Sequence, residues 1–570
     1  MRFPATVLAM LASVWGSMNI ASGATYHLDP SGGNDLWVGT SPETAWQSLS
    51  KLSNATLSPG DTVLLKRGGN WTGQLAPKGS GTAAQPIRLD AYGSGALPRI
   101  DGGGIAGPAV LLYNVEYWEV QNLEITNNAT SDSISRSGIR VYHDTGTVAH
   151  HIHLKNLHVH DVRGSNDFNT GKGSGGIQIN AGGTFQRYDD VLVEGCLVHD
   201  VKRVGITING SIASDLQPVT GYGTGIVMRG NIIYNTGGDG SIIRYAISPL
   251  IERNVVHDFP TGGGGASWTV GLWCRSTLNA LFQFNEVYNS TTTNDGQAYD
   301  SDIFSDGTVF QYNYSHDNLG GFMLLMNSSS NSTLRYNISR NDRGILIHYS
   351  LGLPPNTRIY NNTFYIANGT STKILGRNSG DDASKKTYWN NNLVYNLGSG
   401  GYDSLGGLVA DYNAYFGNHP ASEPAEAHKV TANPKLAAPG TGGTGFATLG
   451  GYQLLDGSPL INTGTTLAGF AGVDFWRNPL TNGPTDIGAH EYAVPVPVIQ
   501  TVTPSGSNLA VQFSTVTNAT YTVQASGNLS PGSWSTISTG ISGTGAPATV
   551  IDTGGSAAPQ RFFRLQYRTP

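Results

Sequence analysis

The sequence has few of the features that stabilise small disulfide-rich proteins or bind nucleic acid. Its 570 residues include only two cysteines, Cys196 and Cys274, which cannot supply a disulfide framework. Charged residues make up 13% of the chain, and the formal net charge of −6 leaves no basic stripe that would follow a phosphate backbone. We therefore expect neither disulfide stabilisation nor a nucleic-acid partner.

Long hydrophobic runs are also missing. No segment after the N-terminus holds the roughly 18 uninterrupted apolar residues of a membrane span, so we expect none. The N-terminus itself has Arg2, the apolar run VLAMLASVW at residues 7–15 and small residues at 22–24. This pattern is typical of a signal peptide. We predict that residues 1–24 are removed and that the mature protein is secreted, to the outside of the cell or to the periplasm.

Helical periodicity is absent from most of the chain, and a short phrase recurs in its place. Between residues 150 and 420, an apolar strand is followed by Asn, two residues, His or Tyr, and often Asn or Asp. The Asn positions are Asn231, Asn254, Asn285, Asn313, Asn337, Asn362 and Asn392, with Leu157 and Cys196 in the same place upstream. A constant phrase separated by variable insertions indicates stacked coils with loops on one side.

Stacking explains the choice of Asn. Parallel coils lie about 4.8 Å apart, so an amide side chain can donate and accept hydrogen bonds along a column of identical residues. We predict an all-β fold, a right-handed parallel β-helix (solenoid) over residues 25–492, with the seven Asn in one continuous column. The His/Tyr positions are interpreted as a stacking ladder rather than a metal site: His199, Tyr234, His257, Tyr288 and His316. Cys196 and Cys274 then lie several coils apart and stay unbridged.

Both ends of such a solenoid need a cover, because an open coil exposes strand edges. Residues 42–52 place Trp46, Leu49 and Leu52 at helical spacing, which predicts a capping helix. Residues 493–570 begin with Pro495-Val496-Pro497 and continue in short alternating strands. They predict a linker and a small C-terminal β-sandwich of fibronectin or immunoglobulin type.

Several stretches resemble a known superfamily. TYHLDPSGGND (25–35), SPETAW (41–46) and PGDTV (59–63) are similar to the opening of bacterial right-handed β-helix carbohydrate enzymes, the pectin-lyase-like superfamily. DIGAHEY (486–492) resembles the closing coil of these proteins, and residues 295–322 resemble β-helical glycoside hydrolases of the α-L-fucosidase/xylanase type. The resemblance implies a polysaccharide or oligosaccharide substrate. Because the superfamily includes hydrolases and lyases, it leaves the reaction open.

A second strand in each coil carries Gly followed by alternating residues, and this alternation predicts which side chains face outward. In the middle coils the predicted outward residues are Asp239, Arg244, Trp273, Arg275, Asp300, Asp302, Met323, Leu325, Leu346 and His348. Cys274 is predicted to point into the core. Asn180 and Asn209 come from earlier coils, and Tyr245 follows Arg244.

We predict that the polar members of this set line a single groove. Asp300 and Asp302, two apart on one strand, and Asp239, two coils away, are the candidate general acid and base. Their spacings of about 6–7 Å and about 9–10 Å favour an inverting glycosidase. The candidate substrate-binding residues, which would supply hydrogen-bond donors and an aromatic platform, are Arg244, Arg275, Trp273, His348, Tyr245, Asn209 and Asn180.

Simpler interpretations exist for the same residues. Asp295 and Asp306 stand beside Gly296 and Gly307 and are interpreted as turn residues. Asp300 and Asp302 could bind Ca²⁺, although the sequence requires no cofactor or metal. His348 could be an ordinary surface histidine, and the two arginines could be solvated charges.

Three functions follow from this pattern. The first is a secreted glycoside hydrolase with paired aspartates. The second is a Ca²⁺-dependent polysaccharide lyase, in which an arginine abstracts the proton beside a uronate carboxylate. The absence of an outward Lys in the central coils makes this lyase less favoured than the hydrolase. The third is a non-catalytic glycan-binding adhesin. In each case we expect a monomer.

Overall fold

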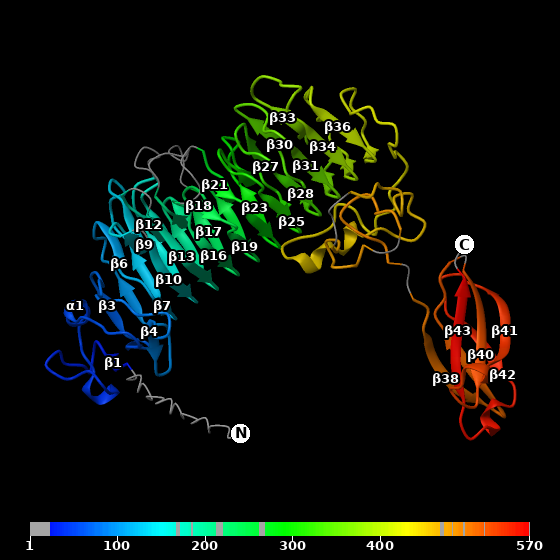
Figure 1. Cartoon of the computed structure of the whole chain (residues 1–570), viewed down its shortest axis with the longest axis horizontal. Coiled ribbons are helices and arrows are strands. Elements are labelled where there is room, and N and C mark those ends of the chain that lie inside the picture. Colours follow the sequence, from blue (N-terminus) through cyan, green and yellow to red (C-terminus); the bar gives the residue numbers. More distant parts are fainter. Residues whose placement is uncertain are drawn as a thin grey trace, which may run out of the picture.

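A computed structural model shows a parallel β-helix followed by a small sandwich (Figure 1). It describes residues 23–146, 148–166, 172–183, 186–211, 221–261, 268–467, 472–480, 483–493, 496–517 and 519–568. The predicted signal peptide falls almost entirely outside these residues and stays a prediction. Within the described ranges, no helix is long and apolar enough to cross a membrane.

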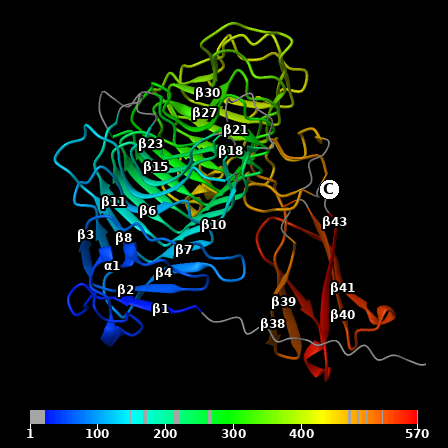
Figure 2. The ribbon, with the colours of Figure 1, turned by 60° about the vertical axis from the view of Figure 1, so that its left-hand side comes forward.

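Three parallel sheets form the faces of the β-helix (Figure 2). In the described part of the chain they contain 14, 13 and 10 strands. The first runs from β1 (Thr25–Leu28) to β36 (Leu408–Asp411), and the second from β3 (Asn70–Thr72) to β37 (Ala414–Gly417). The third, which we call the site sheet, consists of β6 (Gly107–Tyr113), β9 (Arg136–His143), β12 (Gly175–Ala181), β15 (Val204–Asn209), β18 (Ser241–Ile247), β21 (Leu272–Leu278), β24 (Gln297–Ser301), β27 (Gly321–Met326), β30 (Ile345–Ser350) and β33 (Lys373–Arg377). The predicted β-helix is confirmed.

The predicted Asn column is also confirmed. Asn231 Nδ2 donates to Asn254 Oδ1 at 2.9 Å, and the Asn231 backbone N–H donates to the same oxygen at 3.0 Å. The same two bonds link every later member to the next, through Asn285, Asn313, Asn337, Asn362 and Asn392 to Asn413. Cys196 takes the Asn place at the start, since its N–H donates to Asn231 Oδ1 at 2.9 Å. All these side chains are buried.

The His/Tyr ladder runs beside the Asn column. Successive rings from His199 to His316 are stacked with centroids 4.5 to 4.9 Å apart. The residue after each ring has a left-handed backbone, with φ between 48° and 58°: Asp200, Asn235, Asp258, Asn289 and Asp317. Asn and Asp tolerate this conformation better than other residues with a side chain, which explains why they end the repeated phrase.

Cys196 and Cys274 are both free and buried, so the prediction that they are unbridged is confirmed. Burial raises the pKa of the Cys196 thiol to about 12 and that of Cys274 to about 11. Both therefore remain protonated and pack as small apolar side chains.

The predicted N-terminal helix is only partly right. Pro42–Thr44 forms a 3₁₀ turn (η1), and α1 covers Leu49–Asn54, with Leu49 and Leu52 buried. Trp46 lies between them in extended conformation, where it pairs with Leu28 and its ring stacks on Tyr26 at a centroid distance of 4.6 Å. Trp46 therefore extends the first sheet instead of joining a helix over residues 42–52.

The C-terminal segment is a sandwich of two antiparallel three-stranded sheets in the described residues. The sheets are β38 (Ile499–Ser505), β39 (Asn508–Phe513) and β42 (Ala548–Asp552), and β41 (Ser535–Ser542), β40 (Thr520–Ser526) and β43 (Phe562–Arg568). Val511, Phe513, Tyr521 and Val523 fill the core between them. The predicted small sandwich is confirmed.

We expect Asn313→Ala to lower stability because it removes the acceptor of two buried donors, the Asn285 amide and the Asn285 backbone N–H. A buried donor left unpaired costs about 1–3 kcal/mol. Urea unfolding of the full chain, followed by circular dichroism, measures the loss. Asn70→Ala on β3, where the side chain is exposed, is the control. Equal midpoints for the two variants would contradict a stabilising column.

Candidate active site

The register of the site sheet brings two rows of side chains together on its outer surface. The first row consists of Thr207, Ile242, Trp273, Asp300, Leu324 and His348 on consecutive strands. The second consists of Asn180, Asn209, Arg244 and Arg275. Cys274 packs in the core as predicted, so Trp273 and Arg275 on either side of it face outward.

Three residues predicted to face outward do not. Met323, Leu325 and Leu346 pack in the main core, whereas Leu324 joins the outer cluster with Trp273. Which residues of β27 face outward is set by its pairing with β24, where Asp300 lies opposite Leu324. Counting from the nearest glycine could not show this pairing.

A cavity of about 370 Å³ opens over these rows. We call it the acidic cavity, because its walls include the three carboxyl groups of Asp295, Asp300 and Asp302. The other polar and aromatic lining residues are Lys172, Arg244, Arg275, Ser350, Trp268 and Trp273. Trp268 is 55% exposed, whereas Trp273 is only 5% exposed. Trp268 rather than Trp273 therefore offers a free aromatic face to a ligand.

Asp300 is the most deeply buried of the three cavity aspartates. It is 4% exposed, and no hydrogen-bond partner for its Oδ1 is found among the described residues. Burial raises the pKa of Asp300 well above its usual range, and the nearby carboxylates of Asp302 and Asp295 raise it further. Both effects favour the neutral, protonated form of Asp300.

Asp295 lies at the turn before β24. Its φ of 62° and that of 79° at Gly296 confirm that it is a turn residue. The turn also directs its carboxyl group into the cavity, so interpreting it as a turn residue alone was incomplete. Burial, and then the charge of Asp239, raise the pKa of Asp295 to about 7.

Asp302 follows β24 and faces the two arginines of the second row. Its carboxylate accepts a 2.6 Å hydrogen bond from the Ile303 N–H and lies 3.7 Å from Arg275 Nη1. Burial raises the pKa of Asp302, while the Ile303 amide, Arg275 and Arg244 oppose the rise. Both guanidinium groups thus favour the ionised form of Asp302.

Asp239 does not line the cavity, so that part of the prediction is wrong. It is fully buried, 2.7 Å from Lys172 Nζ and 3.8 Å from Arg203 Nη2. It also accepts a 2.9 Å hydrogen bond from Trp273 Nε1. Asp239 therefore holds Lys172 and Trp273 in position beneath and beside the cavity.

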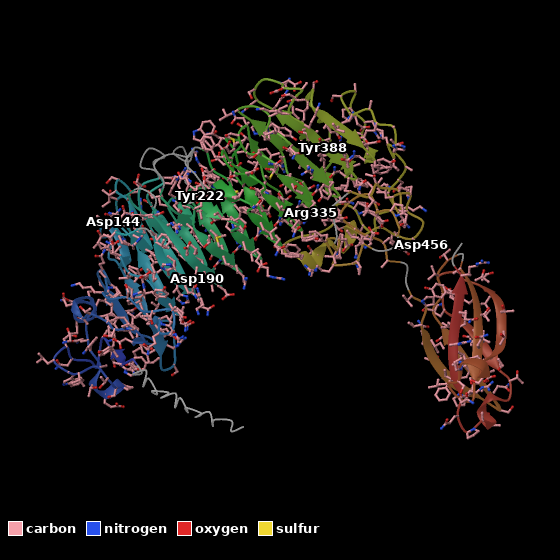
Figure 3. The ribbon with its side chains drawn as sticks, viewed as in Figure 1. Asp144, Asp190, Tyr222, Arg335, Tyr388 and Asp456 are labelled. Atoms are coloured by element: carbon pink, nitrogen blue, oxygen red, sulfur yellow. The ribbon has the colours of Figure 1, made fainter. Side chains whose placement is uncertain are left out.

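A second cavity of about 390 Å³ adjoins the first, and Lys172 and Arg244 line both. We call it the basic cavity, for Arg140, Lys172 and Arg244. The predicted ligand-binding residues Asn180, Asn209 and Tyr245 lie here. The Tyr245 ring is 6.0 Å from that of Tyr222, which is labelled in Figure 3. Burial, with the neighbouring charge of Arg275, lowers the pKa of Arg244.

His348 lines neither cavity, contrary to the prediction of a single groove. It continues the first row beyond Leu324, where its Nδ1 lies 3.3 Å from Gln297 Nε2. Burial lowers the pKa of His348. The two rows thus bring together most, but not all, of the predicted residues.

Four important side chains come from the turns that precede strands of the site sheet. Lys172, Arg203, Trp268 and Asp295 precede β12, β15, β21 and β24, respectively. Alternation along the strands predicted no outward Lys in the central coils; Lys172, from the turn of an earlier coil, nevertheless lines both cavities. Because coils stack in register, these turns stack as well. An alignment of the residues just before each strand could therefore have identified these four side chains from the sequence.

Removal of the Asp295 carboxyl group should change how stability depends on pH. The pKa of Asp295 is about 7 in the folded protein and about 3.9 when unfolded. Between these values the native state keeps a proton that the unfolded state has lost, so this group lowers stability as pH rises from about 4 to about 7. Asp295→Asn removes the effect, and its stability relative to the parent should increase across that window and level off above it.

Urea midpoints at several pH values measure this difference. Asp456→Asn changes an exposed carboxylate far along the chain and is the matched control (Figure 3). Parallel pH curves for the parent and Asp295→Asn would contradict the elevated pKa.

Comparison with known proteins identifies relatives in both sequence and structure. No family model matches the sequence. The chain is 29% identical to a lacto-N-biosidase from Bifidobacterium longum subsp. longum, over 83% of this chain but only 36% of that protein. This chain thus spans about a third of the relative's length.

Two crystal structures of a GH136 lacto-N-biosidase from Eubacterium ramulus are also similar. The selenomethionine derivative has a TM-score of 0.56 and 26% identity, over 69% of this chain and 67% of that one. The native form has a TM-score of 0.53 and 25% identity, over 68% of each chain. In fold and in sequence, the protein is therefore similar to β-helical carbohydrate-active enzymes, as its sequence motifs predicted.

Proposed function

We propose that the protein is a glycoside hydrolase that works in the acidic cavity, with Asp295 as general acid and Asp302 as the ionised carboxylate. The observation that carries this proposal is the placement of three aspartates with opposed environments around one cavity of about 370 Å³. Carboxyl groups whose surroundings favour different protonation states are the chemical requirement for glycoside hydrolysis. The similarity to two lacto-N-biosidases supports the same reaction class.

Each aspartate then has a distinct role. Asp295, with its pKa raised to about 7, keeps a proton at neutral pH that it can donate to the departing glycosidic oxygen. Asp302 faces Arg275 and Arg244 and acts on the anomeric carbon, as nucleophile or through a water molecule. Asp300 is buried, and its surroundings favour the protonated form, so it serves as a hydrogen-bond donor that positions the substrate or Asp302.

The shape of the site supports a substrate longer than one sugar. The acidic and basic cavities adjoin through Lys172 and Arg244. At the mouth of the acidic cavity, Trp268 is 55% and Leu351 is 61% exposed, which provides an apolar surface for a sugar ring. By similarity to the two relatives, we propose that the substrate contains a lacto-N-biose unit, and that the protein is exported by residues 1–24 and acts as a monomer.

One observation favours a second candidate, a uronate lyase. Burial and Arg275 lower the pKa of Arg244, and Lys172 stands beside it, so the site contains cations of the kind that can abstract a proton. The two reactions differ in product, because elimination leaves an unsaturated sugar whereas hydrolysis does not. The calcium requirement of a lyase stays a prediction.

The function is tested by incubating the purified protein with 4-nitrophenyl lacto-N-bioside, with lacto-N-tetraose and with uronate polymers. We expect the release of nitrophenol, measured by its absorbance, and of a disaccharide, detected by chromatography. An unsaturated product from a uronate polymer would replace the hydrolase by the lyase. Binding of these glycans without any turnover would support the adhesin.

We expect Asp295→Asn and Asp302→Asn each to lower kcat by about 10²–10⁴-fold, the usual contribution of a general acid or base. Asp300→Asn keeps a hydrogen-bond donor in the same place and should lower kcat less. The dependence of kcat on pH distinguishes the general acid from the ionised carboxylate. In the parent, kcat should fall above about pH 7 as Asp295 loses its proton, and this fall should be absent in Asp295→Asn. Asp456→Asn is the control for the substitution itself. Full activity of both Asp295→Asn and Asp302→Asn would overturn the assignment.

A further inference from the structure

A cluster of three histidines lies on the second sheet, outside both cavities. His158 and His160 are two apart on β11 (His158–Val162), and His199 lies opposite His160 on β14 (Leu197–Val201) in the next coil. Glu124 lies opposite His158 on β8 (Glu124–Asn127) in the preceding coil. The four side chains therefore come from three successive coils. None has a role in the proposed hydrolysis.

The ring nitrogens of the cluster converge. His158 Nε2 lies 2.8 Å from His199 Nε2. The His160 ring is stacked on the other two, with centroids 4.2 Å from His158 and 5.1 Å from His199. One ring nitrogen from each histidine lies within 4.8 Å of the other two. His160 and His199 have side chains about 15% exposed, so water and small ions can reach them.

Neighbouring carboxylates fix the tautomers of two of these histidines. His199 Nδ1 is 2.6 Å from Asp200 Oδ2, and His160 Nδ1 is 2.8 Å from Asp161 Oδ2. A carboxylate only accepts hydrogen bonds, so each Nδ1 carries a proton, and in the neutral ring Nε2 then has the lone pair that a metal ion needs. A carboxylate on the far nitrogen is also the arrangement that orients metal-ligating histidines in known sites.

Each Nε2 faces a further polar atom. His160 Nε2 points at Glu124 Oε1, 3.2 Å away, and His199 Nε2 points at His158 Nε2, 2.8 Å away. Without a metal ion, protons hold these contacts: a proton on His160 Nε2 donates to Glu124, and the Nε2–H tautomer of His158 donates to His199. A divalent ion between the four ligand atoms would replace these protons with metal–ligand bonds.

We propose that His158, His160 and His199 bind one divalent transition-metal ion, with Glu124 as the fourth ligand. Imidazole nitrogens select zinc, copper or nickel over calcium and magnesium. In a tetrahedral zinc site with bonds of about 2.0–2.1 Å, ligand atoms lie about 3.3 Å apart. The contacts of 2.8 and 3.2 Å reach that separation with shifts of a few tenths of an ångström. The ion would link the coils of β8, β11 and β14.

A second histidine cluster shows why the proposal is specific. Glu119, His151 and His153 also come within ligand distance of one another. There, however, His151 Nδ1 and His153 Nε2 lie 2.7 and 2.8 Å from Asp190, which Figure 3 labels. His151 is held in the same way as His160, but His153 Nε2 is already bonded to Asp190, and no two ring nitrogens of this cluster are in direct contact in the described hydrogen bonds. We therefore assign no ion to this cluster.

The test is titration of the chelator-treated, tag-free full chain with Zn²⁺ in a calorimeter. We expect one strong site in the parent, weakened at least tenfold in His158→Gln and in His199→Gln. His257→Gln is the matched control, because His257 has the same bond to its neighbouring Asp258 at 2.7 Å but stacks between two tyrosines. His153→Gln controls for the second cluster. Both controls are expected to bind Zn²⁺ like the parent.

Co²⁺ gives a readout that does not depend on variants. Tetrahedral coordination by histidine and carboxylate produces intense visible absorption, which is expected at one equivalent of Co²⁺ and lost on adding Zn²⁺. Added Zn²⁺ should also raise the melting temperature of the parent but not that of His199→Gln. Absence of a one-to-one site in the parent, or equal weakening in His257→Gln, would overturn the proposal. Hydrolysis of the glycan substrate plays no part in any of these measurements.

Discussion

The structure depends on the amide column that runs from Asn231 to Asn413. From Asn254 onward, each Oδ1 accepts two hydrogen bonds from the preceding coil, one from the side chain and one from the backbone. Both bonds are satisfied only when successive coils are stacked with their bends directly over one another. Slipping a strand by one residue would exchange its inner and outer faces, so fixing the bends also fixes which residues face outward. The meeting of Trp273 and Asp300 on the site sheet follows from this register.

The electrostatics of the site show a second constraint. Several carboxyl groups lie at low exposure within a few coils, and an isolated buried charge is costly. The protein meets this cost in two ways. Asp239 is paired with Lys172 and Arg203, whereas the surroundings of Asp300 raise its pKa and favour its protonated form. The pKa of Asp295 is raised to about 7, and a group in that range can exchange protons with a substrate near neutral pH.

The repeat predicted the fold well because its cause is local and periodic. The Asn, the ring three residues later and the left-handed Asp or Asn after it are all consequences of one tight bend repeated in each coil. The candidate site was predicted less completely. Alternation placed Trp273, Arg275 and Asp300 correctly, since it depends only on strand geometry. It could not place Asp295 or Lys172, because these come from turns whose length varies between coils and whose direction only the stacked structure defines.

The chain path links the histidine cluster to the cavities. The strand β11, which carries His158 and His160, leads along the chain to Lys172, and β14, which carries His199, leads to Arg203. Lys172 and Arg203 both contact Asp239. An ion bound across β11 and β14 would hold together the two coils that present these cations. The proposed ligands themselves touch neither cavity. In a solenoid each coil contributes one strand to every face, so a ligand on one face acts on the same coils that build the site on another.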